Sequence, residues 1–131
     1  MDSSTQRSSE LVVLLADDEP QVRSVAARAL QSAGYGVVEA RDGLEAWQRF
    51  TRDPDRFGAL LTDVVMPRVS GTELAARVHG VRPELPVVLM TGYTPSELLA
   101  RGREASHGTL VTKPFEASTL IAAMRTALGP G

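Results

Sequence analysis

The sequence contains no cysteine, a single lysine and few aromatic residues. Without cysteine the chain forms neither disulfide bonds nor thiolate metal sites, so any bound metal must be held by oxygen or imidazole. No apolar run approaches the roughly 20 residues that a membrane-spanning helix needs, and the polar start of the chain lacks the layout of a signal peptide. These absences predict a cytoplasmic protein that does not insert into a membrane.

An excess of charge of one sign is also missing. The 14 basic residues nearly balance the 16 acidic ones and leave a formal net charge of −2. Such a chain offers no basic surface for the phosphates of nucleic acid, so we expect no direct binding of nucleic acid. The only lysine is Lys113. Its position cannot be attributed to a lysine-rich surface, which makes it a candidate site residue.

The length and composition suit a single globular domain. The chain has 131 residues, of which 43% are hydrophobic and 23% charged, as is typical of one domain around one hydrophobic core. Residues 1–10 are mostly Ser, Thr, Gln and charged residues, which bury too little apolar surface to order a chain. We therefore expect a flexible tail over residues 1–10 and a folded domain over residues 11–128.

Short apolar runs alternate along this domain with longer amphipathic stretches. The runs predict five strands, at residues 11–16, 36–40, 59–62, 86–90 and 108–111. The stretches predict five helices, at residues 20–33, 43–52, 71–80, 95–104 and 116–128. Residues suited to helix ends agree with these bounds: Pro20, Gly34, Asp42, Ser70 and Thr94. Continuously apolar strands are typical of parallel sheets with both faces covered, so the pattern predicts an α/β fold with an open, doubly wound, five-stranded parallel sheet.

Polar side chains follow four of the predicted strands. Asp17 and Asp18 follow the first strand, and Asp63 follows the third. Thr91 follows the fourth strand, and Lys113 lies just beyond the fifth. Because sites in such sheets form at the carboxyl ends of the strands, we expect these side chains to gather at one edge.

Clustered carboxylates need a positive partner. At about 5 Å and an effective dielectric constant near 20, each pair is repelled by roughly 3 kcal/mol. Mg²⁺ meets that need, since it binds carboxylates, carbonyl oxygens, water and phosphate. An aspartate can accept a phosphoryl group while a lysine and a hydroxyl bind the other phosphoryl oxygens. Asp63, alone at the end of a central strand, is the best candidate for this nucleophile.

Four motifs carry a resemblance to a known family. They are Ala16-Asp17-Asp18-Glu19-Pro20, Asp63-Val64-Val65-Met66-Pro67 with Gly71 behind it, Thr91-Gly92, and Lys113-Pro114-Phe115. Together they resemble the receiver domain of two-component response regulators, over residues 11–128. The resemblance implies a flavodoxin-like sheet with strand order 2-1-3-4-5, and a phosphoacceptor signalling domain rather than an enzyme acting on external substrates.

The resemblance also implies a role for each site residue. Asp63 would accept the phosphoryl group from a histidine kinase or phosphotransfer protein, and Thr91 and Lys113 would bind its oxygens. The implied Mg²⁺ ligands are Asp18, Asp63 and the backbone carbonyl of Val65, with Asp17 acting through a bound water. A cis peptide bond would precede Pro114. The phosphorylated domain would control a downstream protein, as a monomer or weak homodimer.

The sequence departs from the commonest family pattern at Leu110, where many receivers carry a Tyr or Phe that moves when the threonine moves. A leucine there, with Thr91-Gly92-Tyr93, is similar to receivers of hybrid sensor histidine kinases and some stand-alone ones, so both origins stay open. Since Val65 has no group to orient an attacking water, we expect slow self-dephosphorylation.

Two other functions compete with this one. Phosphatases similar to haloacid dehalogenases carry an acid two residues after the nucleophile, where this chain has Val65. A pseudo-receiver that docks proteins without phosphorylation is disfavoured because every expected phosphorylation residue is present. The departure at Leu110 keeps that alternative open.

Overall fold

The computed structural model describes residues 11–93, 96–97, 100 and 108–129. The predicted tail at 1–10, most of the predicted helix at 95–104 and the candidate cap Thr94 lie outside these residues. The strands are β1 (Val12–Ala16), β2 (Gly36–Ala40), β3 (Ala59–Asp63), β4 (Val87–Thr91) and β5 (Thr109–Thr112). The helices are α2 (Pro20–Ser32), α3 (Gly43–Arg52), the short 3₁₀ helix η1 (Pro54–Arg56), α4 (Gly71–Val81) and α6 (Ala117–Leu128).

The five strands form one parallel sheet in the order β2-β1-β3-β4-β5, which confirms the predicted fold class and strand order. Apart from η1, which was not predicted, the described strands and helices begin and end within one residue of the predicted bounds. Three strands extend one residue beyond their predicted carboxyl ends. Asp63 and Thr91 were predicted to follow their strands, and the fifth strand was predicted to end at residue 111, but Asp63, Thr91 and Thr112 are each still paired with a neighbouring strand through the backbone. Strand pairing thus continues into the site residues themselves.

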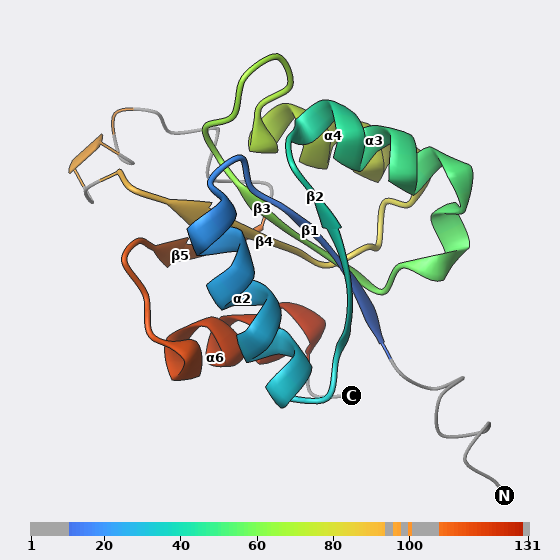
Figure 1. The fold of residues 1–131 in the computed structure, drawn as a ribbon. Coiled ribbons are helices and arrows are strands. Elements are labelled where there is room, and N and C mark those ends of the chain that lie inside the picture. Colours follow the sequence, from blue (N-terminus) through green and yellow to red (C-terminus); the bar gives the residue numbers. More distant parts are fainter. Residues whose placement is uncertain (1–10, 94–95, 98–99, 101–107, 130–131) are drawn as a thin grey trace, which may run out of the picture.

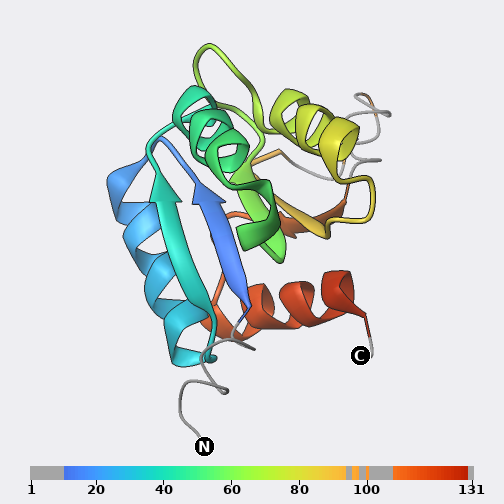
Figure 2. The same cartoon turned by 90° about the vertical axis from the view of Figure 1, so that its right-hand side faces the viewer.

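Helices cover both faces of the sheet, as Figures 1 and 2 show. α2 and α6 pack against one face, and α3 and α4 against the other. The core beneath α2 and α6 includes Leu15, Leu30, Leu61, Met90 and Leu120. The core beneath α3 and α4 includes Leu14, Phe50, Leu60, Leu74 and Leu89. Because side chains alternate between the faces of a strand, two cores require strands that are apolar throughout, as the sequence predicted.

The predicted capping residues that lie in the described part of the chain are in place. Asp42 precedes α3, and its side chain accepts a hydrogen bond from the backbone N–H of Glu45 at 2.8 Å. Ser70 does the same for α4, accepting from the backbone N–H of Glu73 at 3.1 Å. Gly34 follows α2 with φ of +98°, a conformation that glycine adopts without strain. Within the described residues, no helix combines the length and apolar character needed to cross a membrane.

The start of α4 approaches the end of β3 so closely that only glycine fits. The backbone N–H of Gly71 donates a hydrogen bond to the carbonyl of Val64 at 2.8 Å. A Cβ atom on Gly71 would collide with the carbonyl oxygen of Asp63. Gly80, near the other end of the same helix, has open space around its Cβ position.

Gly71→Ala should therefore lower the free energy of unfolding by about 1 to 3 kcal/mol, because the loop after β3 must shift to admit the methyl group. The matched change Gly80→Ala should raise it by about 0.5 to 1 kcal/mol, since alanine is the better helix former. Urea denaturation of both variants checks the pair. Equal effects would show that the close approach at Gly71 does not constrain the fold.

Candidate functional site

The parallel register brings the predicted site residues to one edge of the sheet. The last pair of the β1–β3 ladder directly precedes Asp17 and Asp63, so these two residues lie side by side. The last pair of the β4–β5 ladder is Thr91 with Thr112, and Lys113 follows. The backbone N–H of Lys113 also donates to the carbonyl of Thr91 at 2.7 Å. Residues far apart in the sequence thus meet because adjacent parallel strands end together.

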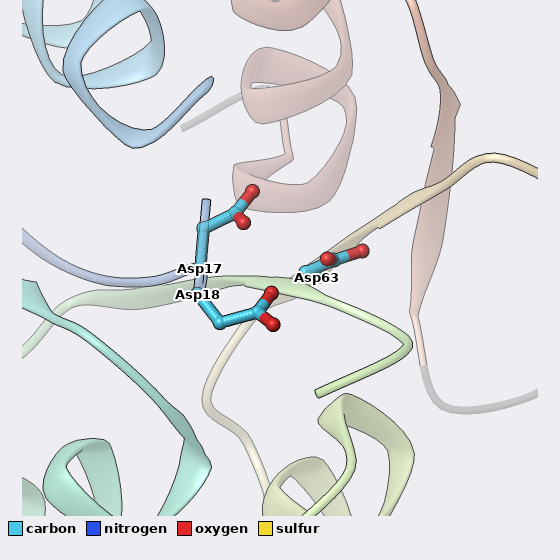
Figure 3. A group of neighbouring side chains, drawn as sticks. All are labelled: Asp17, Asp18 and Asp63. Atoms are coloured by element: carbon cyan, nitrogen blue, oxygen red, sulfur yellow. The ribbon is translucent and has the colours of Figure 1, made fainter. Parts of the chain in front are cut away.

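Three carboxylates converge at this edge, as Figure 3 shows. Asp17, Asp18 and Asp63 each present an oxygen, and these oxygens lie within 4.8 Å of one another. Asp17 is fully buried and Asp63 is 6% exposed, whereas Asp18 is open to solvent. Two of the three acids are thus buried, while Asp18 leaves one side of the cluster open to solvent.

The ammonium group of Lys113 lies among the carboxylates. Its Nζ atom is 3.2 Å from Oδ2 of Asp63 and 3.3 Å from Oδ2 of Asp17. It also donates a hydrogen bond to Oε1 of Glu19 at 3.0 Å. The peptide bond between Lys113 and Pro114 is cis, as predicted. Glu19 was not predicted to be a partner of Lys113. The contact joins two residues that lie 94 positions apart in the sequence.

An arginine that the sequence reasoning missed fixes the loop after β1. Nη1 of Arg23 donates to the backbone carbonyl of Asp17 at 2.9 Å, and its Nε donates to Oε1 of Glu39 at 3.1 Å. The backbone N–H of Glu19 donates to Oδ1 of Asp17 at 2.9 Å. Asp17 is therefore held through its backbone and its side chain. An arginine one turn into a helix that follows an acidic loop is the signal that would have found this contact.

The hydroxyl of Thr91 lies at the same edge and is almost fully buried. Its Oγ1 accepts a hydrogen bond from the backbone N–H of Tyr93 at 3.0 Å. A hydroxyl that accepts one hydrogen bond can still donate its own proton. Thr91 can therefore offer a donor to an oxygen atom that arrives at this edge.

Burial sets the ionisation of the site. It raises the pKa of Asp63 from 3.8 to about 6, the charge of Lys113 opposes this rise, and the charge of Asp17 adds to it. Burial also raises the pKa of Asp17, although the Glu19 N–H and Lys113 oppose it. Burial lowers the pKa of Lys113, but its hydrogen bond with Glu19 and the charges of Asp63 and Asp17 outweigh this effect and raise it overall. The lysine is thus held charged while the two buried acids resist ionisation.

The donor set suits a divalent, oxygen-binding cation. One ammonium group does not balance three carboxylates, so the ionised site keeps an excess of negative charge. Oδ2 of Asp17 is buried and has no hydrogen-bond partner, although Lys113 lies near it. Carboxylate and carbonyl oxygens with room for water are the ligands that Mg²⁺ takes. The residues present therefore fit a magnesium ion.

Comparisons with known proteins agree with this site. Residues 13–125 match the family described as the response regulator receiver domain. The response regulator receiver protein CpdR of Brucella abortus is 34% identical over 109 residues, which is 83% of this chain and 89% of that protein. The response regulator MprA of Mycobacterium tuberculosis is 35% identical over 117 residues, 88% of this chain but 50% of that protein. The chain thus spans about half the length of MprA.

Solved structures show the same architecture. The chemotaxis protein CheY4 of Vibrio cholerae superposes with a TM-score of 0.81 at 30% identity, covering 92% of this chain and 100% of that one. The receiver domain of the hybrid histidine kinase CckA superposes with a TM-score of 0.75 at 32% identity, covering 90% of this chain and 99% of that one. With the family matched over most of the folded residues and the acidic edge in place, this chain belongs to the response regulator receiver domain family.

Proposed function

We propose that Asp63 is the phosphoacceptor of this receiver domain, and that phosphorylation there switches its interaction with a downstream protein. The observation that carries the proposal is the position of Asp63, which is nearly buried, 3.2 Å from the Lys113 ammonium and beside two further carboxylates. A receiver domain is a signalling domain and not an enzyme of external substrates. The complete set of charged groups at the edge disfavours the docking-module alternative.

Phosphoryl transfer begins with the ionised carboxylate of Asp63. An oxygen of Asp63 attacks the phosphorus of a kinase phosphohistidine, the P–N bond breaks, the histidine nitrogen keeps the electron pair, and an acyl phosphate forms. With a pKa of about 6, Asp63 is mostly ionised at neutral pH. Lys113 pairs with the phosphoryl oxygens, and its raised pKa keeps it charged for that role. Thr91 donates its hydroxyl proton to another of these oxygens.

The metal ligands that we propose are the side chains of Asp18 and Asp63 and the backbone carbonyl of Val65, with Asp17 acting through a bound water. When bound, Mg²⁺ neutralises negative charge on the carboxylates and the transferring phosphoryl oxygens. The buried Oδ2 of Asp17, which has no hydrogen-bond partner, supports this assignment.

Signal output involves the region around Thr91. Tyr93 and Leu110 are partly buried against the core beneath α3 and α4. Since a leucine replaces the common aromatic residue, we propose that backbone shifts after Thr91 transmit the change. The donor is a histidine kinase or phosphotransfer protein in the cytoplasm, and the domain acts as a monomer or weak homodimer, alone or within a hybrid kinase.

Incubation with acetyl phosphate and Mg²⁺ should add one phosphoryl group, detected by intact mass. Asp63→Asn should abolish the addition because the amide is not a nucleophile, and EDTA should abolish it because the metal is removed. Asp55→Asn, an exposed aspartate of η1, is the matched control and should be phosphorylated like the wild type. A mass gain that persists in Asp63→Asn would refute the assignment.

Asp63 should also make the metal-free fold less stable as the pH rises. Its folded-state pKa of about 6 lies above the ordinary value of 3.8, so the folded state binds the proton more tightly. The contribution of Asp63 to the stability of the fold is thus fully present below about pH 4 and is lost as the pH rises through about 6. In EDTA near pH 7.5, Asp63→Asn should raise the free energy of unfolding by about 3 kcal/mol, and this gain should disappear below about pH 4. Urea denaturation across this pH range checks it, and a gain independent of pH would contradict the explanation.

The phosphorylated domain should lose its phosphoryl group over minutes or longer, because the exposed apolar side chain of Val65 cannot orient water. Val65→Asn should shorten the lifetime by about tenfold or more, since an amide can hold a water near the phosphorus. Intact mass followed after removal of acetyl phosphate measures both lifetimes. Val81→Asn, the same change at the end of α4, should have no effect. A wild-type lifetime of seconds would contradict the role given to Val65.

A further inference from the structure

The loop between β3 and α4 contains a strained turn at Arg68. Arg68 has a φ of +70°, the only positive φ outside glycine among the described residues. The backbone N–H of Val69 donates to the carbonyl of Pro67 at 2.8 Å, which closes a three-residue turn around Arg68. A γ-turn with positive φ at its central residue is rare and strained. Such a conformation persists only when surrounding contacts hold it.

One contact that holds this turn comes from the start of α3. Nη2 of Arg68 donates to Oδ2 of Asp42 at 2.9 Å. The other oxygen of Asp42 caps α3 by accepting from the backbone N–H of Glu45. The side chain of Asp42 is only 17% exposed, so it is shielded more than an ordinary surface carboxylate. Asp42 therefore connects the start of α3 to the tip of the loop between β3 and α4.

The same loop carries the backbone carbonyl of Val65. The side chains on either side, Val64 and Met66, are buried in the core beneath α3 and α4. Val69 is buried too. Its carbonyl oxygen lies so close to Gly43 that a Cβ atom on Gly43 would collide with this oxygen. The loop is thus held at its beginning and its end, and the strained turn lies between these contacts. A change in that turn would move the backbone that contains Val65.

We propose that Arg68 is a positioning residue of the phosphorylation site. Its ion pair with Asp42 holds the turn that places the Val65 carbonyl for Mg²⁺, and so it sets the affinity for the metal. The inference rests on the proposed function, because it takes Val65 as a metal ligand. Neither Arg68 nor Asp42 touches the metal in this proposal.

The test is the dissociation constant of Mg²⁺, measured by titration calorimetry on the unphosphorylated protein. Arg68→Ala removes the ion pair, and Asp42→Ser removes it while keeping a side chain that caps α3. Each should weaken Mg²⁺ binding by about two- to fivefold, the effect expected of one partly exposed pair. The double variant should be no weaker than either single variant, because both changes remove the same contact. Arg77→Ala breaks the ion pair between Arg77 and Glu73 on α4, which has the similar length of 2.8 Å, and should leave the affinity unchanged.

Arg68→Gly separates positioning from stability. Glycine relieves the positive φ, so this variant should be more stable to urea than Arg68→Ala. Because it also lacks the ion pair, it should bind Mg²⁺ no more tightly than Arg68→Ala. Arg68→Lys, which retains the charge, should recover part of the affinity. If the affinity for Mg²⁺ rises and falls with the free energy of unfolding across these variants, the positioning role of Arg68 is overturned.

The outcomes also separate this inference from the proposed function. If the wild type binds Mg²⁺ in a manner that depends on Asp63, but Arg68→Ala and Asp42→Ser bind it equally well, only the role of Arg68 is overturned. Additive losses in the double variant would likewise overturn it, because the two residues would then act separately. If the wild type does not bind Mg²⁺, both the magnesium site and the role of Arg68 fail together.

Discussion

Mutual repulsion between carboxylates at one edge of the sheet is the constraint that the rest of the site accommodates. Strand pairing places Asp17 and Asp63 side by side, and burial deprives both of water. The cores on the two faces of the sheet fix this arrangement, because moving either acid would disturb a paired strand. The fold thus concentrates negative charge that a cation would stabilise, and this charge suits the metal and the phosphoryl group of the proposed function.

Lys113 is the positive group among these carboxylates, and the proposed function depends on its contacts. It contacts Asp63, Asp17 and Glu19, so its single positive charge is shared among three acids. If Asp63 is phosphorylated as proposed, the phosphoryl group would add about −1.5 to −2 charges beside the ammonium group. The new charge would then compete with Glu19 for Lys113. Phosphorylation would thereby redistribute contacts between the loop after β1 and the loop after β5.

Much of the fold and of the site could be predicted from the sequence, because both depend on regular features. Continuous apolar strands indicate a parallel sheet, and parallel strands bring Asp17, Asp63 and Lys113 to one edge whatever the details of the loops. The contact between Glu19 and Lys113 could not be predicted, since it depends on side-chain conformations in two loops. The turn at Arg68 could not be predicted either, because arginine has no preference for positive φ.

The contacts around the site also differ between its two sides. On the side of the β3–α4 loop, Gly71 fixes the backbone, Val69 is buried and Arg68 is paired. On the side of Thr91, the contacts are backbone hydrogen bonds: the hydroxyl accepts one from the Tyr93 N–H, and the carbonyl accepts one from the Lys113 N–H. Under the proposed function this difference has a use, because the metal must stay in place while the domain responds to a phosphoryl group. The carbonyl of Val65 would lie on the side where packing and an ion pair hold the loop, and the hydroxyl of Thr91 on the side where the backbone is proposed to shift.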